Sequence, residues 1–276
     1  MQKAVEPTIR SRIIAIANPP KKFGLIVGLL VTCCWLTGRT SHAEEGILPP
    51  NFAFLRNIDP TIIQDIRYAT ANNFTGAPVP GYTIGECVVL RDVAIALKNA
   101  QRKLRTKGLS LKVFDCYRPV QSVQSFIAWT KKKPQTVDKH FYPRLTRRQL
   151  VSKGYIGKVS THSRGIAVDV TLVVSKMNVR PLPTEEKNIE TCIEPASMSL
   201  RSNELDMGTG FDCFDKKSHV YSREISDKQQ TNRRILKHVM TTYGFKGYAK
   251  EWWHFSYTRL KYLPKRHDFP IARIAD

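Results

Sequence analysis

The alternation of apolar and polar residues in one segment is the feature that most constrains how this chain can fold. Every second residue from Ile166 to Leu172 is apolar, and the residues between them are small or polar. This period of two predicts a β-strand that packs one face on a hydrophobic core. Asp169 lies in the middle of the strand, seven residues after His162. Its carboxylate either faces solvent on the polar side of the strand or takes part in a functional site.

The other segments predict an irregular succession of strands and helices. Pro119 suits the first turn of a helix, and Thr146 with Gln149 and Asp227 with Gln230 have the spacing of helix capping boxes. A further helix is predicted over 90–104, and strands are predicted over 62–70, 109–115, 166–172 and 245–257. Tight turns between the strands suit antiparallel pairing. We therefore expect an α+β fold in a single domain, with a mainly antiparallel sheet and flanking helices.

The first 43 residues do not resemble part of a folded domain. Lys21 and Lys22 precede the apolar run "FGLIVGLLVTCCWL", and polar and small residues follow it before Glu44. This arrangement is typical of a secretory signal, so we expect a periplasmic or otherwise exported protein. An uncleaved anchor and a lipoprotein are the alternatives. Because the run is short for a transmembrane helix, no stable membrane span is expected after cleavage.

Residues 44–276 are numerous enough to form one domain with a sizeable core. Within them, segment 175–205 is polar, contains Pro181 and Pro183, and interrupts the pattern, so we interpret it as an insertion. The formal net charge of the chain is +21, which favours anionic partners. For an exported chain these are envelope polymers such as peptidoglycan. The sequence has neither zinc-finger spacing nor basic heptads, so no nucleic-acid partner is expected.

Four cysteines remain once the apolar run is set aside, namely Cys87, Cys116, Cys192 and Cys213. No two of them have CxxC spacing, which makes a cysteine-based zinc site a poor interpretation. In an oxidising compartment disulfides are expected, and four cysteines allow three connectivities. Among these we favour Cys87–Cys116 and Cys192–Cys213.

Two histidines each lie in a predicted strand region or just before one, in a segment that also contains a carboxylate. His162 precedes Asp169, and His254 follows Glu251 in "EWWH". A catalytic zinc is typically held by three nitrogen or oxygen ligands and keeps a fourth position for water. His162, Asp169 and His254 would supply that set, giving one zinc per chain at the sheet. The alternative for "EWWH" is a core strand whose acid and imidazole are incidental.

Two further residues could complete a hydrolytic site. Bound zinc lowers the pKa of water towards about 7, and Glu251 is the candidate general base that takes the proton of that water. Arg118 in "DCYRP" is the candidate cation for the oxyanion, and its alternative role is a salt bridge that closes a turn. Residues three apart on a regular strand point to opposite faces. A bend within "EWWH" is therefore needed if Glu251 and His254 are to reach one metal.

Taken together, these segments resemble the D-alanyl-D-alanine dipeptidases, which belong to a wider group of zinc peptidases related to lysostaphin and to D,D-carboxypeptidases. The likeness rests on "DxYRP", "SxHxxGxAxD" and "ExxH", and it extends to "RYAT", "NNFTGAPVPGY" and "MGTGFD". The resemblance implies hydrolysis of D-Ala-D-Ala by a zinc-bound water. It implies that His162, Asp169 and His254 are the ligands, Glu251 the base and Arg118 the residue that stabilises the transition state.

The resemblance also implies that Asp212, Ser160 and Tyr68 hold the free amino group of the substrate. A carboxylate suits this task because a charge-assisted hydrogen bond recognises the α-ammonium of a short substrate. Asp212 therefore favours a dipeptidase over the nearest alternative, a D,D-carboxypeptidase or endopeptidase that trims peptidoglycan. A non-catalytic zinc module that binds cell-wall material is the other alternative. Glu251 and Arg118 argue against it, since a pure binding module needs no base.

Overall fold

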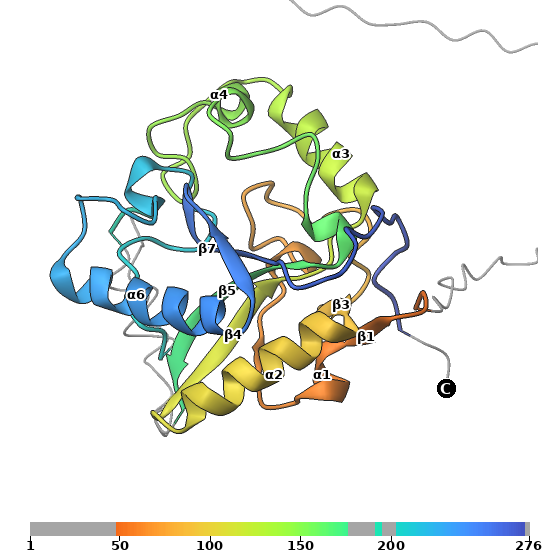
Figure 1. The fold of residues 1–276 in the computed structure, drawn as a ribbon. Helices are drawn as coiled ribbons and strands as arrows, with labels where there is room; N and C mark the ends of the chain where they lie inside the picture. The colour runs from red at the N-terminus through yellow and green to blue at the C-terminus, as the bar shows by residue number, and fades with distance from the viewer. Residues whose placement is uncertain (1–47, 176–190, 195–202, 274–276) are drawn as a thin grey trace, which may run out of the picture. The chain divides into compact units, whose positions relative to one another are not determined.

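A computed structural model describes residues 48–175, 191–194 and 203–273 of the chain. The predicted signal segment and most of the predicted insertion lie outside these residues. Within them, α-helices and a larger, mainly antiparallel sheet form the α+β fold that the sequence predicts (Figure 1). The sheet contains β2 (Ile63–Gln64), β4 (Leu109–Asp115), β5 (Ala167–Val174), β7 (Glu251–Tyr257) and β6 (Phe245–Tyr248), in that spatial order.

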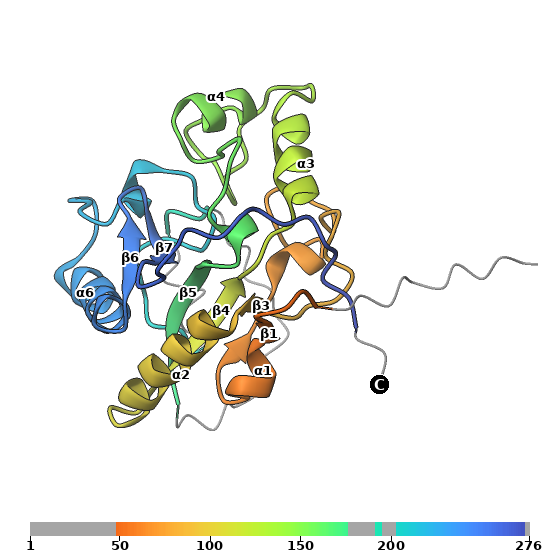
Figure 2. The ribbon, with the colours of Figure 1, turned by 45° about the vertical axis from the view of Figure 1, so that its right-hand side comes forward.

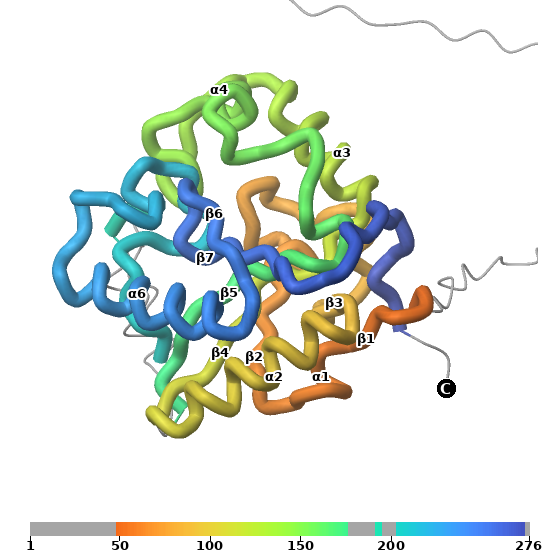
Figure 3. Tube along the Cα trace, in the orientation of Figure 1, coloured from red at the N-terminus to blue at the C-terminus, as the bar shows by residue number. Residues whose placement is uncertain are grey.

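The larger sheet is antiparallel except at one edge. β4, β5, β7 and β6 pair antiparallel, whereas the short β2 runs parallel to β4, beside which it lies in Figure 3. A second sheet joins β1 (Phe52–Phe54) antiparallel to β3 (Val88–Leu90). β5 is the predicted strand, but it is buried along almost its whole length, whereas its alternating sequence predicted the burial of one face. Both of its faces are covered by protein.

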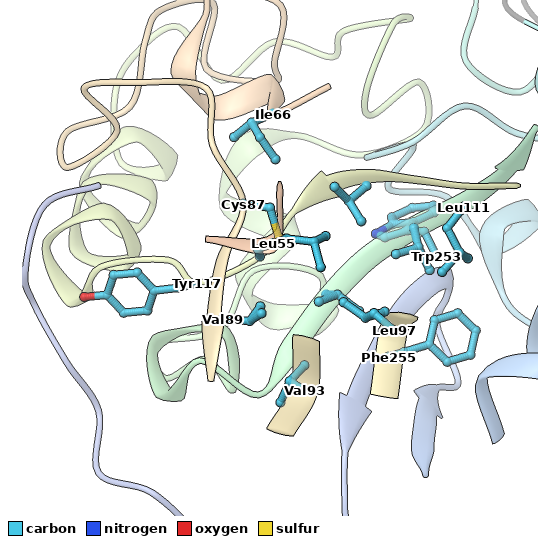
Figure 4. Packing of buried hydrophobic residues seen from close by; sticks show 14 of the residues in the cluster. Leu55, Ile66, Cys87, Val89, Val93, Leu97, Leu111, Tyr117, Trp253 and Phe255 are labelled. Atoms are coloured by element: carbon cyan, nitrogen blue, oxygen red, sulfur yellow. A yellow bond between two sulfur atoms is a disulfide. The ribbon is translucent and has the colours of Figure 1, made fainter. Parts of the chain in front are cut away.

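The helices cover the larger sheet unevenly. α2 (Arg91–Arg105) and α6 (Asp227–Thr242) lie on one side, while α3 (Val120–Thr130) and α4 (Arg147–Ser152) lie together on the other (Figures 1 and 2). The short α1 (Leu55–Ile58) follows β1. Figure 4 shows Leu97 of α2 in one apolar cluster with Leu111 of β4 and Phe255 of β7. We call the sheet face that carries Leu111 the core face and the opposite one the site face.

Strand register determines which residues reach the site face. Residues directly opposite each other on neighbouring strands point to the same face. Val113 pairs with Val170 on the core face, but the register then shifts, so that Asp115 pairs with Asp169. Asp169 in turn pairs with His254. The shift is a β-bulge, which turns Asp115 to the face of its two partners. Three polar side chains thus form one row across β4, β5 and β7.

Both disulfides have the predicted pairing. Cys87 is bonded to Cys116, and Cys192 is bonded to Cys213. All four cysteines are buried. The first bond joins the residue before β3 to the residue after β4, and the second ties the residues described at 191–194 to the segment before the short 3₁₀ turn Lys216–Ser218.

Two local predictions are wrong in detail. The strand predicted over 62–70 ends at Gln64, and Arg67–Ala69 form a 3₁₀ turn that directs Tyr68 inward. The last helix is capped one residue earlier than predicted, because the hydroxyl of Ser226 accepts the N–H of Gln229 and the Gln229 amide oxygen accepts the N–H of Ser226. The helix starting after Pro119 and the capping box at Thr146 are confirmed.

Candidate metal centre and active site

Three side chains that are far apart in sequence converge on the site face. His162 lies in a 3₁₀ turn (His162–Arg164) just before β5, Asp169 lies on β5 and His254 lies on β7. His162 Nε2 is 3.1 Å from His254 Nδ1 and 3.3 Å from Asp169 Oδ1. His254 Nδ1 is 3.1 Å from the same aspartate oxygen. These are the three residues predicted from the sequence as metal ligands.

The three donor atoms fit a tetrahedral metal ion. Zinc–nitrogen and zinc–oxygen bonds of about 2.0–2.1 Å place the ligand atoms of a tetrahedral site about 3.3 Å apart. The three distances between the donors here are 3.1, 3.1 and 3.3 Å. The donor set of two imidazoles and one carboxylate is also of the kind that zinc prefers. These residues could therefore hold one metal ion and leave a coordination position open.

The protein fixes the tautomer of His162. Its Nδ1 lies 2.6 Å from the backbone carbonyl oxygen of Cys116, which can only accept a hydrogen bond. Nδ1 must therefore carry the proton, and Nε2 presents a lone pair to Asp169 and His254. Metal-binding histidines commonly donate their second nitrogen to such a carbonyl. The buried Asp115 also lies close, with Oδ2 3.3 Å from the same Nδ1.

Asp115 is a site residue that the sequence analysis did not identify. Its Oδ2 accepts hydrogen bonds from Nε and Nη2 of Arg118, at 2.9 and 2.7 Å, and its Oδ1 accepts one from the Tyr82 hydroxyl. Burial alone would lower the pKa of Arg118, but Asp115, Tyr68, Tyr82 and Asp169 together outweigh this effect, so that the guanidinium pKa lies well above its ordinary value. The sequence feature that could have identified Asp115 is its position at the end of a predicted strand, in "FDCYRP". The bulge that turns it inward could not be deduced from spacing.

Arg118 is held between carboxylates and aromatic rings. Its Nη2 is 3.5 Å from Asp169 Oδ2, and its guanidinium carbon lies 5.0 Å from the ring centre of Tyr68 and 5.2 Å from that of Phe126. Its side chain is only 13 % exposed. The alternative role considered for Arg118, an ion pair at a turn, is thus present in the contact with Asp115. The same contact aims the guanidinium at the site.

Glu251 lies next to the three donors. The pairing of β6 with β7 shifts between Gly247 and Tyr248, so the bend required within "EWWH" is present. Glu251 Oε2 is consequently 4.0 Å from His254 Nδ1. Burial, followed by the charges of Asp169 and Asp212, raises the pKa of the Glu251 carboxyl well above its ordinary value.

The pKa values of two donor residues, Asp169 and His254, are shifted in the direction that favours metal binding. Two neighbouring imidazoles hold the pKa of Asp169 well below its usual range, although burial opposes this shift. Burial lowers the pKa of His254 and so favours the neutral ring. A carboxylate and neutral imidazoles are the protonation states that bind metal.

The three donor residues line a cavity of about 410 Å³, and a second set of polar side chains lines the same cavity. The Tyr68 hydroxyl donates a 2.8 Å hydrogen bond to Asp212 Oδ2, and both residues are buried. Ser160 also lines the cavity, and its Oγ accepts the backbone N–H of His162. The sequence analysis named all three. Burial and the charge of Asp169 raise the pKa of Asp212 to about 8.

Comparison with known proteins identifies the family. The family described as D-ala-D-ala dipeptidase matches residues 50–180 and 193–271. The chain belongs to this family. The D-ala-D-ala dipeptidase family consists of metallopeptidases, so the resemblance stated from the motifs is confirmed, as is the classification of the chain as an enzyme. The match is interrupted within the segment predicted as an insertion, and that prediction stays open.

Individual relatives cover most of the chain. A D-alanyl-D-alanine dipeptidase of Enterococcus faecium is 34 % identical over 222 residues, which are 80 % of this chain and 98 % of the relative. One from Streptomyces coelicolor is 33 % identical over 225 residues, with the same coverage of both chains. Among the residues that the structure describes, no helix is long and apolar enough to cross a membrane.

Proposed function

We propose that this protein is an exported zinc D,D-dipeptidase that hydrolyses D-Ala-D-Ala. The observation that carries the proposal is the presence, in one cavity, of a metal-fitting donor triad and a buried Asp212–Tyr68 pair. Membership of the D-ala-D-ala dipeptidase family and the printed names of the relatives support the choice of substrate.

The proposed metal ligands are His162, Asp169 and His254. Zinc held by them would supply a Lewis acid for the scissile carbonyl and would make water more acidic at neutral pH. Glu251 would accept the proton of the attacking water and return it to the leaving amine of D-alanine. A divalent cation beside Glu251 lowers the raised pKa of its carboxyl, because an opposite charge favours the ionised form. Glu251 can then act as a base near neutral pH.

Arg118 would stabilise the negative charge that develops on the carbonyl oxygen. Its guanidinium is fixed before substrate arrives, by Asp115 on one side and by the rings of Tyr68 and Phe126 on the other. A donor fixed in this way needs no reorganisation during the reaction, which is the main source of electrostatic catalysis.

Asp212 would bind the substrate ammonium, with help from Tyr68 and Ser160. Asp212 is buried, and among the hydrogen bonds of the described residues the Tyr68 hydroxyl occupies only one of its two oxygens. The other oxygen is free to accept a charge-assisted hydrogen bond from an ammonium. An ammonium in this position also lowers the raised pKa of the carboxyl. A substrate whose amino group is blocked would leave the second oxygen of Asp212 buried without a partner.

Export is proposed from the N-terminal sequence and is supported by the two disulfides. Disulfides persist mainly in oxidising compartments. The strongly basic composition suits contact with anionic peptidoglycan, the source of such peptides. N-terminal sequencing of the protein recovered from a periplasmic fraction tests this part, since the proposal requires a start near residue 44.

Turnover of free and blocked substrates, combined with metal analysis, tests the proposed activity. The purified protein should contain about one zinc per chain and release D-alanine from D-Ala-D-Ala. It should cut N-acetyl-D-Ala-D-Ala at least about a hundredfold more slowly, since a buried polar group without its partner costs selectivity of this order. Equal rates on both substrates would indicate a carboxypeptidase, and zinc without turnover a binding module. Full activity in chelator would refute the metallopeptidase mechanism.

A further inference from the structure

Each disulfide is attached to a different part of the candidate active site. Cys116 lies between Asp115 and Arg118, and its carbonyl oxygen is the group that orients His162. Cys213 directly follows Asp212, the proposed ammonium ligand. Both bonds are buried next to polar residues of the site rather than at the surface.

Cys192 holds the Asp212 turn from both sides. Its sulfur is bonded to Cys213, and its carbonyl oxygen accepts the N–H of Gly210 at 3.0 Å. Asp212 lies between these two anchors with a φ of +57°, a conformation that residues other than glycine rarely adopt. Because such a conformation costs free energy, the surrounding structure must maintain it. Cys192 is itself fixed, since its N–H donates to the carbonyl of Lys139 at 2.9 Å.

The Cys87–Cys116 bond holds the support of His162. Cys87 is anchored by its N–H, which donates to the Gln64 side-chain oxygen at 2.7 Å, and by its carbonyl, which accepts the N–H of Leu55 at 2.8 Å. Because the disulfide links the two residues, it also restricts the position of Cys116. The carbonyl of Cys116 then lies 2.6 Å from Nδ1 of His162, as described above.

We propose that the two disulfides are positioning elements of the active site with separate tasks. Cys87–Cys116 maintains the metal affinity by orienting His162, and Cys192–Cys213 maintains substrate affinity by holding Asp212 in its turn. The inference rests on the proposed function. It extends that function in two ways. Cys192 and Cys213 contribute to recognition of the substrate ammonium, and the active site forms correctly only after the disulfides have formed.

Two double variants separate the tasks. Cys192→Ala with Cys213→Ala should raise KM for D-Ala-D-Ala about tenfold, with kcat within about twofold and zinc affinity unchanged. Cys87→Ala with Cys116→Ala should weaken zinc binding about 10- to 100-fold, the range found when an outer-shell partner of a metal ligand is lost. At saturating zinc its KM should be unchanged. Competition with a chromophoric chelator measures the zinc affinity independently of activity.

A double-mutant cycle tests whether the second disulfide acts through Asp212. Asp212→Asn alone should raise KM, and adding the Cys192→Ala/Cys213→Ala pair should raise it little further, because residues acting through one group are not additive. Additive effects on KM would refute the inference. The inference would also be refuted if both double variants lost kcat/KM and zinc affinity together, and if these losses followed the decrease in unfolding temperature. That pattern indicates general destabilisation of the fold.

Reduction of the wild-type protein provides the same comparison if a variant does not fold. A phosphine and one water convert each disulfide to two thiols, the water supplying the oxygen of the phosphine oxide and the two thiol hydrogens, and alkylation with mass spectrometry identifies the bond broken. The protein with only Cys192–Cys213 reduced should show the KM effect, and an unchanged KM would refute the proposal. Absence of both zinc and turnover in the oxidised protein would instead refute the proposed function.

Discussion

Replacing Asp115 by asparagine should damage both the stability of the fold and the rate of the reaction. Asp115 is fully buried and accepts two hydrogen bonds from Arg118 and one from Tyr82. An asparagine of the same shape has one acceptor oxygen, which can serve Arg118, whereas its amide nitrogen can only donate, so the hydrogen bond with the Tyr82 hydroxyl would have to reverse its direction. It also removes the negative charge that compensates the guanidinium. Arg118 would retain Asp169, at 3.5 Å, as a more distant partner.

The size of the stability effect follows from these contacts. Breaking a buried charge pair by removing one partner costs about 3–5 kcal/mol. Because Asp169 partly compensates Arg118, we expect a loss near 3 kcal/mol in the free energy of unfolding. For a chain of this size about 2–4 °C of unfolding temperature corresponds to 1 kcal/mol, so the midpoint should fall by roughly 6–12 °C. Calorimetry of the zinc-loaded protein measures this shift.

The kinetic effect should be larger than general destabilisation explains. A guanidinium displaced by about 1 Å from the developing oxyanion costs roughly a hundredfold in rate, so kcat for D-Ala-D-Ala should fall by about that factor. Tyr82→Phe is the matched control, since it removes one hydrogen bond from an uncharged donor to the same carboxylate and should cost about 1.5–3 kcal/mol. Its kcat should stay within about threefold of the wild type. If both variants lose the same kcat, Asp115 does not position Arg118 for catalysis.

Three further predictions concern the metal and its neighbours. The Glu251→Gln variant should keep its zinc, and its kcat should fall at least about a hundredfold. Its unfolding temperature should be no lower than that of the wild type, because the substitution removes a buried charge. Zinc analysis, steady-state kinetics and thermal unfolding check these expectations. The kcat/KM of the wild type should rise with pH towards about 8 as Asp212 ionises, and a pH profile of Asp212→Asn should lack this rise. Chelation should lower the unfolding temperature and zinc should restore it, because the ion binds only the folded state.

The donor residues could be predicted because their signals are local. The alternation around Asp169 indicated a strand, and the three-residue spacing of Glu251 and His254 required a bend, which the register shift of β6 against β7 supplies. The capping box at Thr146 is likewise a short-range pattern. In each case the residues that determine the feature lie within one turn or one strand of it.

The features that could not be predicted depend on distant partners. Tyr68 turns inward, and the predicted strand ends before it, because its hydroxyl binds Asp212, 144 residues further along the chain. The role of Asp115 depends on a bulge opposite β5, which only the pairing of the two strands reveals. Spacing and propensity near these residues indicate neither partner, and only the family resemblance placed Tyr68 together with Asp212.

The bulge in β4 explains how one sheet can support both a hydrophobic core and the candidate metal site. Without it, the residue at position 115 would follow the alternation of Leu111 and Val113 and point to the core face, away from Asp169. Because a shift of one residue reverses the face of every later side chain, a single extra residue places the carboxylate beside its two partners. Arg118 follows three residues later and is aimed by that carboxylate. The position of the proposed oxyanion donor is therefore set by strand register, and the same register keeps Val113 and Val170 in the core.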